Sequence, residues 1–107
     1  MEIRILGPIE VHENGRVVAL GGPKQRALLA LLALNANRVL SRDRLIDQLW
    51  GGSPPPTAAT ALHGHVSSLR KALGADVIVT RSPGYVLLVD PDQIDLGRFE
   101  SLRARGD

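Results

Sequence analysis

The apolar and polar positions of this chain first form three short strand-like runs, at Ile3–Leu6, Ile9–His12 and Arg16–Ala19. Gly7-Pro8 separates the first two runs and Asn14-Gly15 separates the last two. An Asn-Gly pair between such runs is a strong hairpin signal, because both residues tolerate the left-handed backbone of a tight turn. The pattern therefore predicts a small antiparallel sheet at the start of the chain.

Two helical segments are predicted next. Lys24–Ala36 is rich in Ala and Leu and is apolar on most sides, which indicates a central, largely buried helix. Val39-Leu40 is expected to be a brief extended link. Ser41 then has the character of an N-cap for a second helix that runs to Trp50, with Asp43 favourably placed in its first turn.

A third helix, Thr57–Leu73, has two different faces and is expected to end at Gly74. At the helical period, one face is a narrow apolar stripe formed by Leu62, Val66, Leu69 and Leu73. The opposite face is small, hydroxylated or basic, with Thr57, Thr60, Gly64, Ser67, Ser68 and Lys71. An ordinary solvated face would carry more long charged side chains, whereas this one suits close approach to another surface, such as a nucleic-acid groove.

The segments on either side of this helix indicate the fold class. Gly51–Pro56 cannot be helical and is expected to form a stiff loop. Val77–Thr80 and Tyr85–Val89 are predicted strands, joined by a basic turn at Arg81–Gly84. A sheet, three helices and a two-stranded wing make an α+β winged helix-turn-helix, in which the third helix enters the major groove.

The end of the chain differs in character from the rest. Residues 1–90 are expected to form the winged helix domain, and residues 91–107 to form a linker and the start of a following helical domain. The tail is acidic and then weakly helical, with Leu96, Phe99 and Leu102 at helical spacing.

Composition narrows the class of protein. The 107 residues are enough for one domain and include no cysteine, so disulfides and thiolate metal sites are excluded. The start has no signal-peptide pattern, and the richest apolar stretch, Ala27–Leu34, is far too short to span a bilayer. We therefore expect a cytoplasmic protein with no membrane partner.

The distribution of charge says more than the formal net charge of +2. Eight Lys or Arg residues stand against three Asp between Lys24 and Arg81, whereas both flanks carry more acidic than basic residues. The middle of the chain is thus the part expected to face a polyanion. Scattered solubilising charge would account for the same counts.

Four pieces of sequence, taken in order, resemble a known family. They are Val39–Leu45, Leu49–Gly51, His65–Leu73 and Gly84-Tyr85, and they look like the effector domain of OmpR/PhoB-type response regulators. Ile5–Pro8 and Asp95–Phe99 are more similar to the SARP/AfsR group of actinobacterial activators. The resemblance implies that the chain is the N-terminal piece of a larger regulator.

The resemblance also implies roles by position. The helix Thr57–Leu73 would be the recognition helix, and the turn with Arg81 and Ser82 would be the wing that reaches a minor groove or its phosphates. The loop of Gly51, Gly52, Ser53, Pro54 and Pro55 matches a segment that touches RNA polymerase in relatives. Arginines that response regulators often carry on the recognition helix are replaced here by Thr60, Ser67 and Ser68, so the operator sequence is not transferable.

Individual residues carry alternatives. Lys71 points away from the apolar stripe and is expected to contact DNA, whereas Arg70 lies nearer the core edge, as a phosphate clamp or in an internal salt bridge. His63 and His65 project about 200° apart and cannot chelate one metal ion together. We interpret them as residues beside phosphates or bases, or as buried histidines.

Other basic residues lie in first helical turns, where the dipole disfavours cations. Helix N-termini that face phosphate would resolve the conflict. Solvated surface charge is the alternative for each. These residues are Lys24, Arg26, Arg42 and Arg44. Trp50 is interpreted as a core residue whose indole N–H can also reach a phosphate.

The sequence offers no convergent cluster of titratable groups, so we expect neither an enzyme nor a metal or other cofactor. The leading hypothesis is an activator domain that binds direct repeats in double-stranded DNA, as a head-to-tail dimer, and recruits RNA polymerase. The alternative is a protein–protein interaction module built on a degenerate winged helix.

Overall fold

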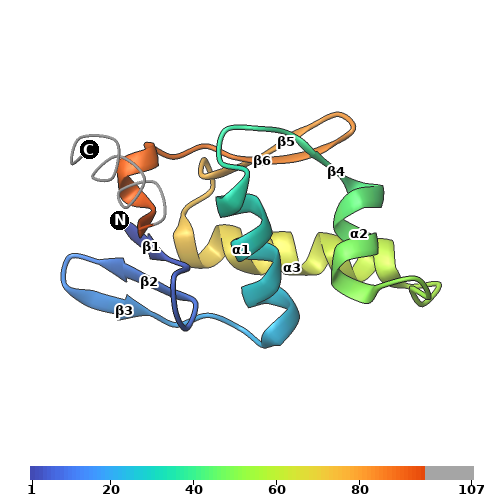
Figure 1. Cartoon of the computed structure of the whole chain (residues 1–107), viewed down its shortest axis with the longest axis horizontal. Coiled ribbons are helices and arrows are strands. Elements are labelled where there is room, and N and C mark those ends of the chain that lie inside the picture. Colours follow the sequence, from blue (N-terminus) through green and yellow to red (C-terminus); the bar gives the residue numbers. More distant parts are fainter. Residues whose placement is uncertain (96–107) are drawn as a thin grey trace, which may run out of the picture.

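The chain begins with a three-stranded antiparallel sheet, formed by β1 (Glu2–Arg4), β2 (Glu10–Glu13) and β3 (Arg16–Val18) in the computed structural model (Figure 1). The structure describes residues 1–95. Asn14 and Gly15 connect β2 to β3 with φ values of 52° and 78°, the left-handed backbone that a two-residue hairpin turn requires. The predicted hairpin is confirmed. Ile3 and Val11 face inward and are fully buried.

Helix α1 (Pro23–Leu34) starts at a proline, whose missing N–H costs nothing in the first turn. The helix ends two residues before the predicted Ala36. Asn35 closes it, and its side-chain amide donates a 2.9 Å hydrogen bond to the Leu31 carbonyl. The sequence predicts a largely buried helix, but the last turn departs from this prediction because Leu34 is 56% exposed.

Helices α2 (Arg42–Trp50) and α3 (Ala58–Leu73) form where the pattern predicts them. The Ser41 hydroxyl caps α2 by accepting a 3.1 Å hydrogen bond from the Arg44 backbone N–H. Gly74 ends α3 with φ of 115°, and its N–H donates to the Arg70 carbonyl at 2.8 Å. Both predicted caps are confirmed.

The wing is a three-stranded sheet rather than a hairpin alone. Its strands β4 (Leu40–Ser41), β5 (Ile78–Arg81) and β6 (Gly84–Leu87) lie in the order β4-β6-β5. The extended backbone expected at Val39-Leu40 is present at Leu40, and the structure adds a pairing that the sequence did not show: Leu40 pairs with Tyr85 and Ser41 with Gly84. Two residues are too few for a period to show.

The segment after the wing folds back onto the first strand. A single 3₁₀ turn, η1 (Pro91–Gln93), leads to Ile94, which forms a parallel bridge with Ile3 and is only 3% exposed. Residue 94 therefore packs against the N-terminal sheet, and the boundary expected at residue 90 stays a prediction. Leu96, Phe99 and Leu102, at helical spacing in the predicted following domain, lie outside the described residues.

One core joins these parts. Leu28, Leu29 and Leu32 of α1 meet Leu62 and Leu69 of α3, and all five are at most 1% exposed. The core therefore holds α3 against α1 by one face and leaves its other face free. No helix within residues 1–95 combines the length and apolarity that a membrane span needs.

Candidate nucleic-acid interface

The outer face of α3 is open to solvent along the length of the helix. Thr60, Gly64, Ser68 and Lys71 are exposed and Ser67 is half-buried, whereas Val66 on the opposite face is fully buried. The structure confirms that α3 has one buried apolar face and one exposed face of small, hydroxylated and basic residues.

Gly64 lies in the middle of this outer face. A Cβ added at Gly64 would meet no atom within 4 Å, so packing inside the domain does not require a glycine there. Glycine in a helix interior costs roughly 1 kcal/mol relative to alanine. Because Gly64 has no side chain, another molecule can approach the helix backbone closely at this point.

Thr57 precedes the first turn of α3. It is exposed, and its hydroxyl makes no capping hydrogen bond to the helix. The backbone alone closes this end, with the Ala58 N–H donating to the Pro55 carbonyl at 3.0 Å. The Thr57 hydroxyl is thus unused by the helix cap.

The preceding loop, residues 51–56, projects at one end of the molecule (Figure 1). Each of its six residues is exposed, and Gly51 has a φ of 70° where the chain leaves α2. The three consecutive prolines stiffen the loop. It therefore presents a fixed surface away from the core.

Arg70 joins α3 to the wing. Its Nε donates to the Ile78 carbonyl at 2.8 Å, and its Nη2 donates to the Thr80 hydroxyl, also at 2.8 Å. The internal salt bridge considered from the sequence is not what holds this guanidinium, since its partners here are a carbonyl and a hydroxyl. A DNA contact by Arg70 stays a prediction, and it would have to use the remaining N–H groups.

Tyr85 of β6 is buried between two arginines. The Arg42 guanidinium carbon lies 5.6 Å from the ring centroid and that of Arg70 lies 5.9 Å from it. Within residues 1–95, the Arg42 side chain has no hydrogen-bond or ion-pair partner. The ring fixes the position of a charge that is left available to an anion.

The N-terminal turn of α2 lies beside the wing. The Arg42 backbone N–H donates to the Pro83 carbonyl at 3.2 Å, which fixes the start of α2 against the wing turn. Arg44 is exposed in the same turn, and its side chain is unpaired among the residues described. These two predicted site residues therefore lie on one side of α3, next to the wing.

The tip of the wing exposes Arg81, Ser82 and Pro83. Gly84 behind it is buried, and a Cβ there would overlap the Leu40 carbonyl oxygen. Only glycine lets β6 approach β4 at this point. The close approach fixes where the basic tip stands relative to α2.

The other flank of α3 carries an aromatic cluster. The Trp50 ring is half-buried and lies 6.4 Å from the His65 ring, centroid to centroid, with the planes inclined by 32°. The interpretation of Trp50 as a core residue is confirmed in part, because the ring packs against the core and is also partly accessible. His63 is exposed and lies away from this cluster around the helix.

Lys24, one of the first-turn cations considered for a phosphate contact, has an aromatic neighbour in the structure. Its Nζ lies 5.5 Å from the centroid of the Trp50 ring. A cation at the unfavourable end of a helix is visible in the sequence, whereas its place beside Trp50 depends on how α1 packs against α2.

Arg26 has a structural role within the domain, and the phosphate contact considered for it stays a prediction. Its Nε donates to the Gly21 carbonyl at 3.1 Å, and its Nη1 donates to the Ile9 carbonyl at 3.0 Å. These bonds tie α1 to the N-terminal sheet. They leave Lys24 as the free cation of this turn among the residues described.

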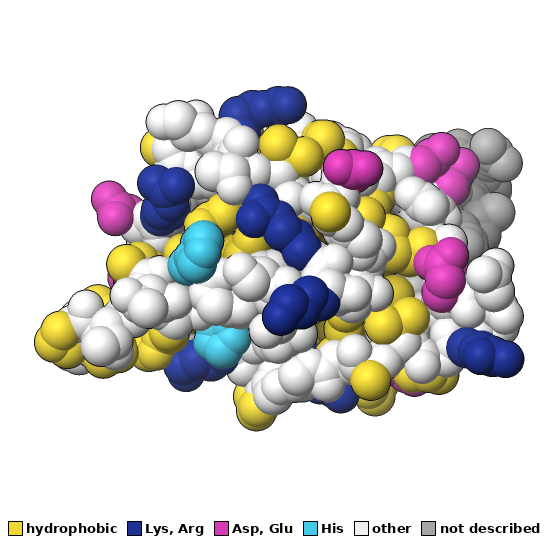
Figure 2. Space-filling view, turned by 180° about the vertical axis from the view of Figure 1, so that it is seen from behind, with side chains coloured by type: hydrophobic (Ala, Val, Ile, Leu, Met, Phe, Trp, Pro, Cys, Tyr) yellow, Lys and Arg dark blue, Asp and Glu magenta, His cyan; other side chains and the backbone are white. Residues whose placement is uncertain are grey.

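Figure 2 shows the face on which α3 lies, behind α1 in the view of Figure 1. Lys, Arg and His side chains gather over the middle of this face, and Asp and Glu side chains stand towards its edges. The face therefore has the charge pattern that suits a polyanion.

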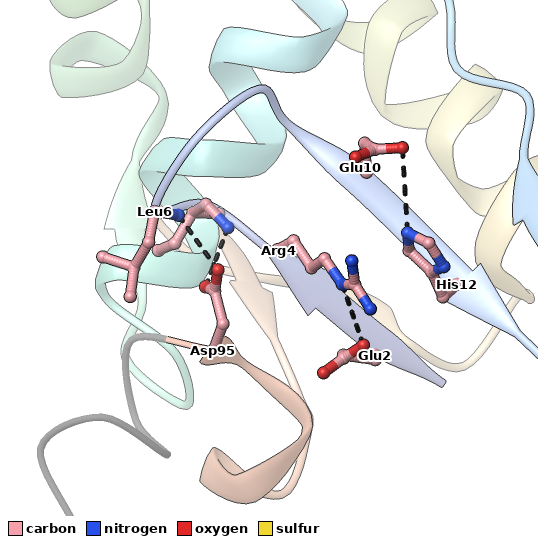
Figure 3. A network of polar contacts seen from close by, with 7 residues as sticks. Glu2, Arg4, Leu6, Glu10, His12 and Asp95 are labelled. Carbon is pink, nitrogen blue, oxygen red and sulfur yellow. Dashed lines mark hydrogen bonds and ion pairs between the residues drawn. The ribbon is translucent and has the colours of Figure 1, made fainter.

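A second polar network lies on the N-terminal sheet (Figure 3). Arg4 pairs with Glu2 at 3.0 Å, and the His12 Nε2 lies 3.7 Å from a Glu10 carboxylate oxygen. Asp95 accepts hydrogen bonds from the backbone N–H groups of Ile5 and Leu6, at 2.8 and 3.0 Å. Arg4 therefore has a carboxylate partner, which distinguishes it from Arg42, Arg44 and Lys24 around α3.

The chain matches the family described as "Transcriptional regulatory protein, C terminal" over residues 15–87. MoaR1 of Mycobacterium tuberculosis, a transcriptional regulatory protein, is 39% identical over 99% of this chain and 36% of its own length. The structure of EmbR from the same organism has a TM-score of 0.93 and 40% identity over 98% of this chain and 29% of that one. The DNA-binding domain of Escherichia coli CadC has a TM-score of 0.64 and 33% identity over 76% of this chain and 79% of that one.

The chain thus spans about a third of the length of MoaR1 and of EmbR. Its order of elements, its open third helix and these relatives agree with one another, and the family consists of regulators rather than enzymes. The chain belongs to the OmpR/PhoB-type family of winged helix DNA-binding domains of transcriptional regulators, and its relatives there are regulators of the SARP type.

Proposed function

We propose that this domain reads specific sites in double-stranded DNA as part of a cytoplasmic transcriptional activator. Helix α3 lies in the major groove, and the wing turn at Arg81 and Ser82 reaches the adjacent minor groove. The observation that carries the proposal is the outer face of α3, which is small and open and has cations on both sides without carboxylate partners among residues 1–95.

The residues divide the work by their chemistry. Thr57, Thr60, His63, Ser67 and Ser68 carry the hydrogen-bonding groups that read base edges, at about 1–3 kcal/mol for each good contact. The basic residues bind phosphates and give the complex its salt dependence. They are Arg42, Arg44, Arg70, Lys71 and Arg81.

We further propose that two copies bind direct repeats in a head-to-tail arrangement. The N-terminal sheet and the 51–56 loop stand at opposite ends of the molecule (Figure 1). Copies placed in the same orientation, about one helical turn apart, would bring the loop end of one towards the sheet end of the next. An arrangement of this kind is heterologous and needs no two-fold axis.

The 51–56 loop is proposed to contact RNA polymerase. It is exposed throughout, stiffened by Pro54, Pro55 and Pro56, and stands clear of the wing. A rigid loop loses little entropy on binding, which suits a contact made only while the domain sits on DNA.

Selection of bound sequences from a random duplex library with the 107-residue chain tests the DNA proposal. We expect enrichment of paired direct repeats, spaced by about one helical turn. Enrichment of inverted repeats or of single sites would contradict the head-to-tail arrangement. No enrichment, together with no binding of any duplex at low salt, would favour the protein–protein module instead.

A transcription assay with purified RNA polymerase and a promoter that carries the selected site tests the loop. Replacing Pro54 and Pro55 by Gly should lower transcript yield while leaving affinity for the DNA unchanged. Equal transcription by the loop variant and the unaltered chain would remove the loop from the polymerase contact.

A further inference from the structure

Lys24 lies at the N-terminal end of a helix, has no anionic partner among the described residues, and has one aromatic neighbour. It lies in the first turn of α1, which contains no acidic residue, where the helix dipole opposes positive charge. Within residues 1–95 it has no hydrogen-bond or ion-pair partner, and its Nζ lies 5.5 Å from the Trp50 ring centroid. Its surroundings therefore supply no charge that neutralises it.

Three elements converge at this point. Lys24 comes from α1, Trp50 is the last residue of α2, and His65 comes from the middle of α3 with its ring 6.4 Å from that of Trp50. The lysine is thus held at the flank of the recognition helix, although it belongs to a different helix.

The flank is opposite the one that carries the wing. His65 and Arg70 are five positions apart on α3 and project about 140° from each other. His65 faces Trp50 and Lys24, whereas Arg70 faces the wing, with Arg42 beyond the Tyr85 ring. On each flank of α3 an aromatic ring therefore positions a cation: Trp50 positions Lys24 on one flank, and Tyr85 positions Arg42 on the other.

A helix in the major groove has a phosphate backbone on each side, because the groove is about 12 Å wide, close to the diameter of a helix with its side chains. We infer that Lys24 binds a DNA phosphate on the backbone opposite to the one that Arg42 faces. The inference rests on the proposed docking of α3. Trp50 acts as the positioning residue, since its ring limits where the ammonium group can stand.

Salt dependence measures this contact directly. Each neutralised phosphate contributes about 0.9 to the slope of log affinity against log salt concentration. For Lys24→Ala, we expect the slope to be smaller by about 0.9 and binding at about 50 mM salt to be on the order of ten-fold weaker. The measurement is fluorescence anisotropy of the selected duplex with the 107-residue chain at several salt concentrations.

Two matched variants make the result specific. Arg16→Ala removes one exposed cation from β3, where the structure shows no side-chain partner for it, and should leave the slope unchanged. Lys24→Arg keeps the charge over the ring and should retain the slope. Thermal unfolding of each variant shows whether the fold is kept.

The single tryptophan of the chain gives a second readout at the site itself. We expect the fluorescence of Trp50 to change on addition of the duplex to the unaltered chain, because a phosphate then comes near its ring. In Lys24→Ala this change should be smaller at equal saturation with DNA.

The outcomes separate the two proposals. A slope for Lys24→Ala equal to that for Arg16→Ala, while Lys71→Ala and Arg42→Ala lower it, would overturn the role of Lys24 and leave the docking of α3 standing. Absence of binding by the unaltered chain would refute the docking proposal itself.

Discussion

The guanidinium of Arg70 on α3 donates a 2.8 Å hydrogen bond to the hydroxyl of Thr80 on β5, and thereby ties α3 to the wing. A second bond, to the Ile78 carbonyl, fixes the same guanidinium. The angle between α3 and the wing is thus held by side-chain chemistry as well as by the core.

Thr80→Val should separate this tie from the rest of the fold. Loss of the hydroxyl removes one hydrogen bond and should lower the free energy of unfolding by about 0.5–1.5 kcal/mol. Affinity for the selected duplex should also fall, because the wing loses a constraint on its position. Thr80→Ser keeps the hydroxyl and should retain both properties. Chemical denaturation and anisotropy measure them, and equal behaviour of the two variants would refute the tie.

Gly64→Leu should affect stability and DNA binding in opposite directions. A side chain there meets nothing inside the domain, and leucine is a better helix former by roughly 1 kcal/mol, so the variant should be at least as stable as the unaltered chain. Binding of the selected duplex should be abolished, because the side chain would fill the space between the helix and the groove. Gly64→Ala should stabilise similarly with a milder loss of affinity. Normal binding by the leucine variant would show that α3 does not lie deep in the groove.

Lys71→Ala should weaken DNA binding and make the salt slope smaller by about 0.9, as expected for one lost phosphate contact. The residue lies in the last turn of α3, so some loss of stability, about 0.3–1 kcal/mol, is also expected from the helix dipole. Lys71→Arg keeps the charge and should retain the slope. A salt titration of anisotropy decides the matter, and unchanged binding by Lys71→Ala would remove this residue from the interface.

Gly84→Ala should destabilise the domain, in contrast to Gly64→Ala. A Cβ at residue 84 overlaps the backbone of β4, and the sheet must shift to admit it. Overpacking of this kind costs about 1–3 kcal/mol. The two alanine variants form an internal comparison in urea denaturation, and a stability for Gly84→Ala equal to that of the unaltered chain would contradict the close approach of β4 and β6.

Shortening the chain tests where the folded unit ends. A chain that stops after Asp90 should be less stable than one that stops after Asp95, by at least about 2 kcal/mol. The shorter chain lacks Ile94, which is 3% exposed, and the two hydrogen bonds that Asp95 accepts from Ile5 and Leu6. Equal unfolding midpoints for the two chains would support the boundary at residue 90.

The elements that could be predicted from sequence are those whose signal is local. The Asn14-Gly15 turn, the Ser41 cap and the stripe of α3 each depend on residues within one or two turns of chain, and each was found. Strand β4 was missed because its two residues are defined by a partner more than forty positions away.

The residues of the candidate interface also differ in whether they could be predicted from the sequence. Residues of the outer face of α3 could be named from helical period alone. The dual role of Arg70, the bonds of Arg26 to the sheet and the place of Lys24 over Trp50 could not, because each depends on how separate elements pack. Cations in first helical turns are visible in the sequence as an unfavourable placement. Which of these cations form hydrogen bonds within the domain could be learned only from the structure.

The bridge between Ile3 and Ile94 brings the entry and the exit of the folded unit side by side. A domain whose two ends meet can be inserted into longer chains as a cassette, since a connection at either end leaves the opposite surfaces untouched. Here that junction lies beside β1, and Asp95 anchors it to the backbone of Ile5 and Leu6. Any segment that continues from Asp95 would therefore start from a fixed point beside β1.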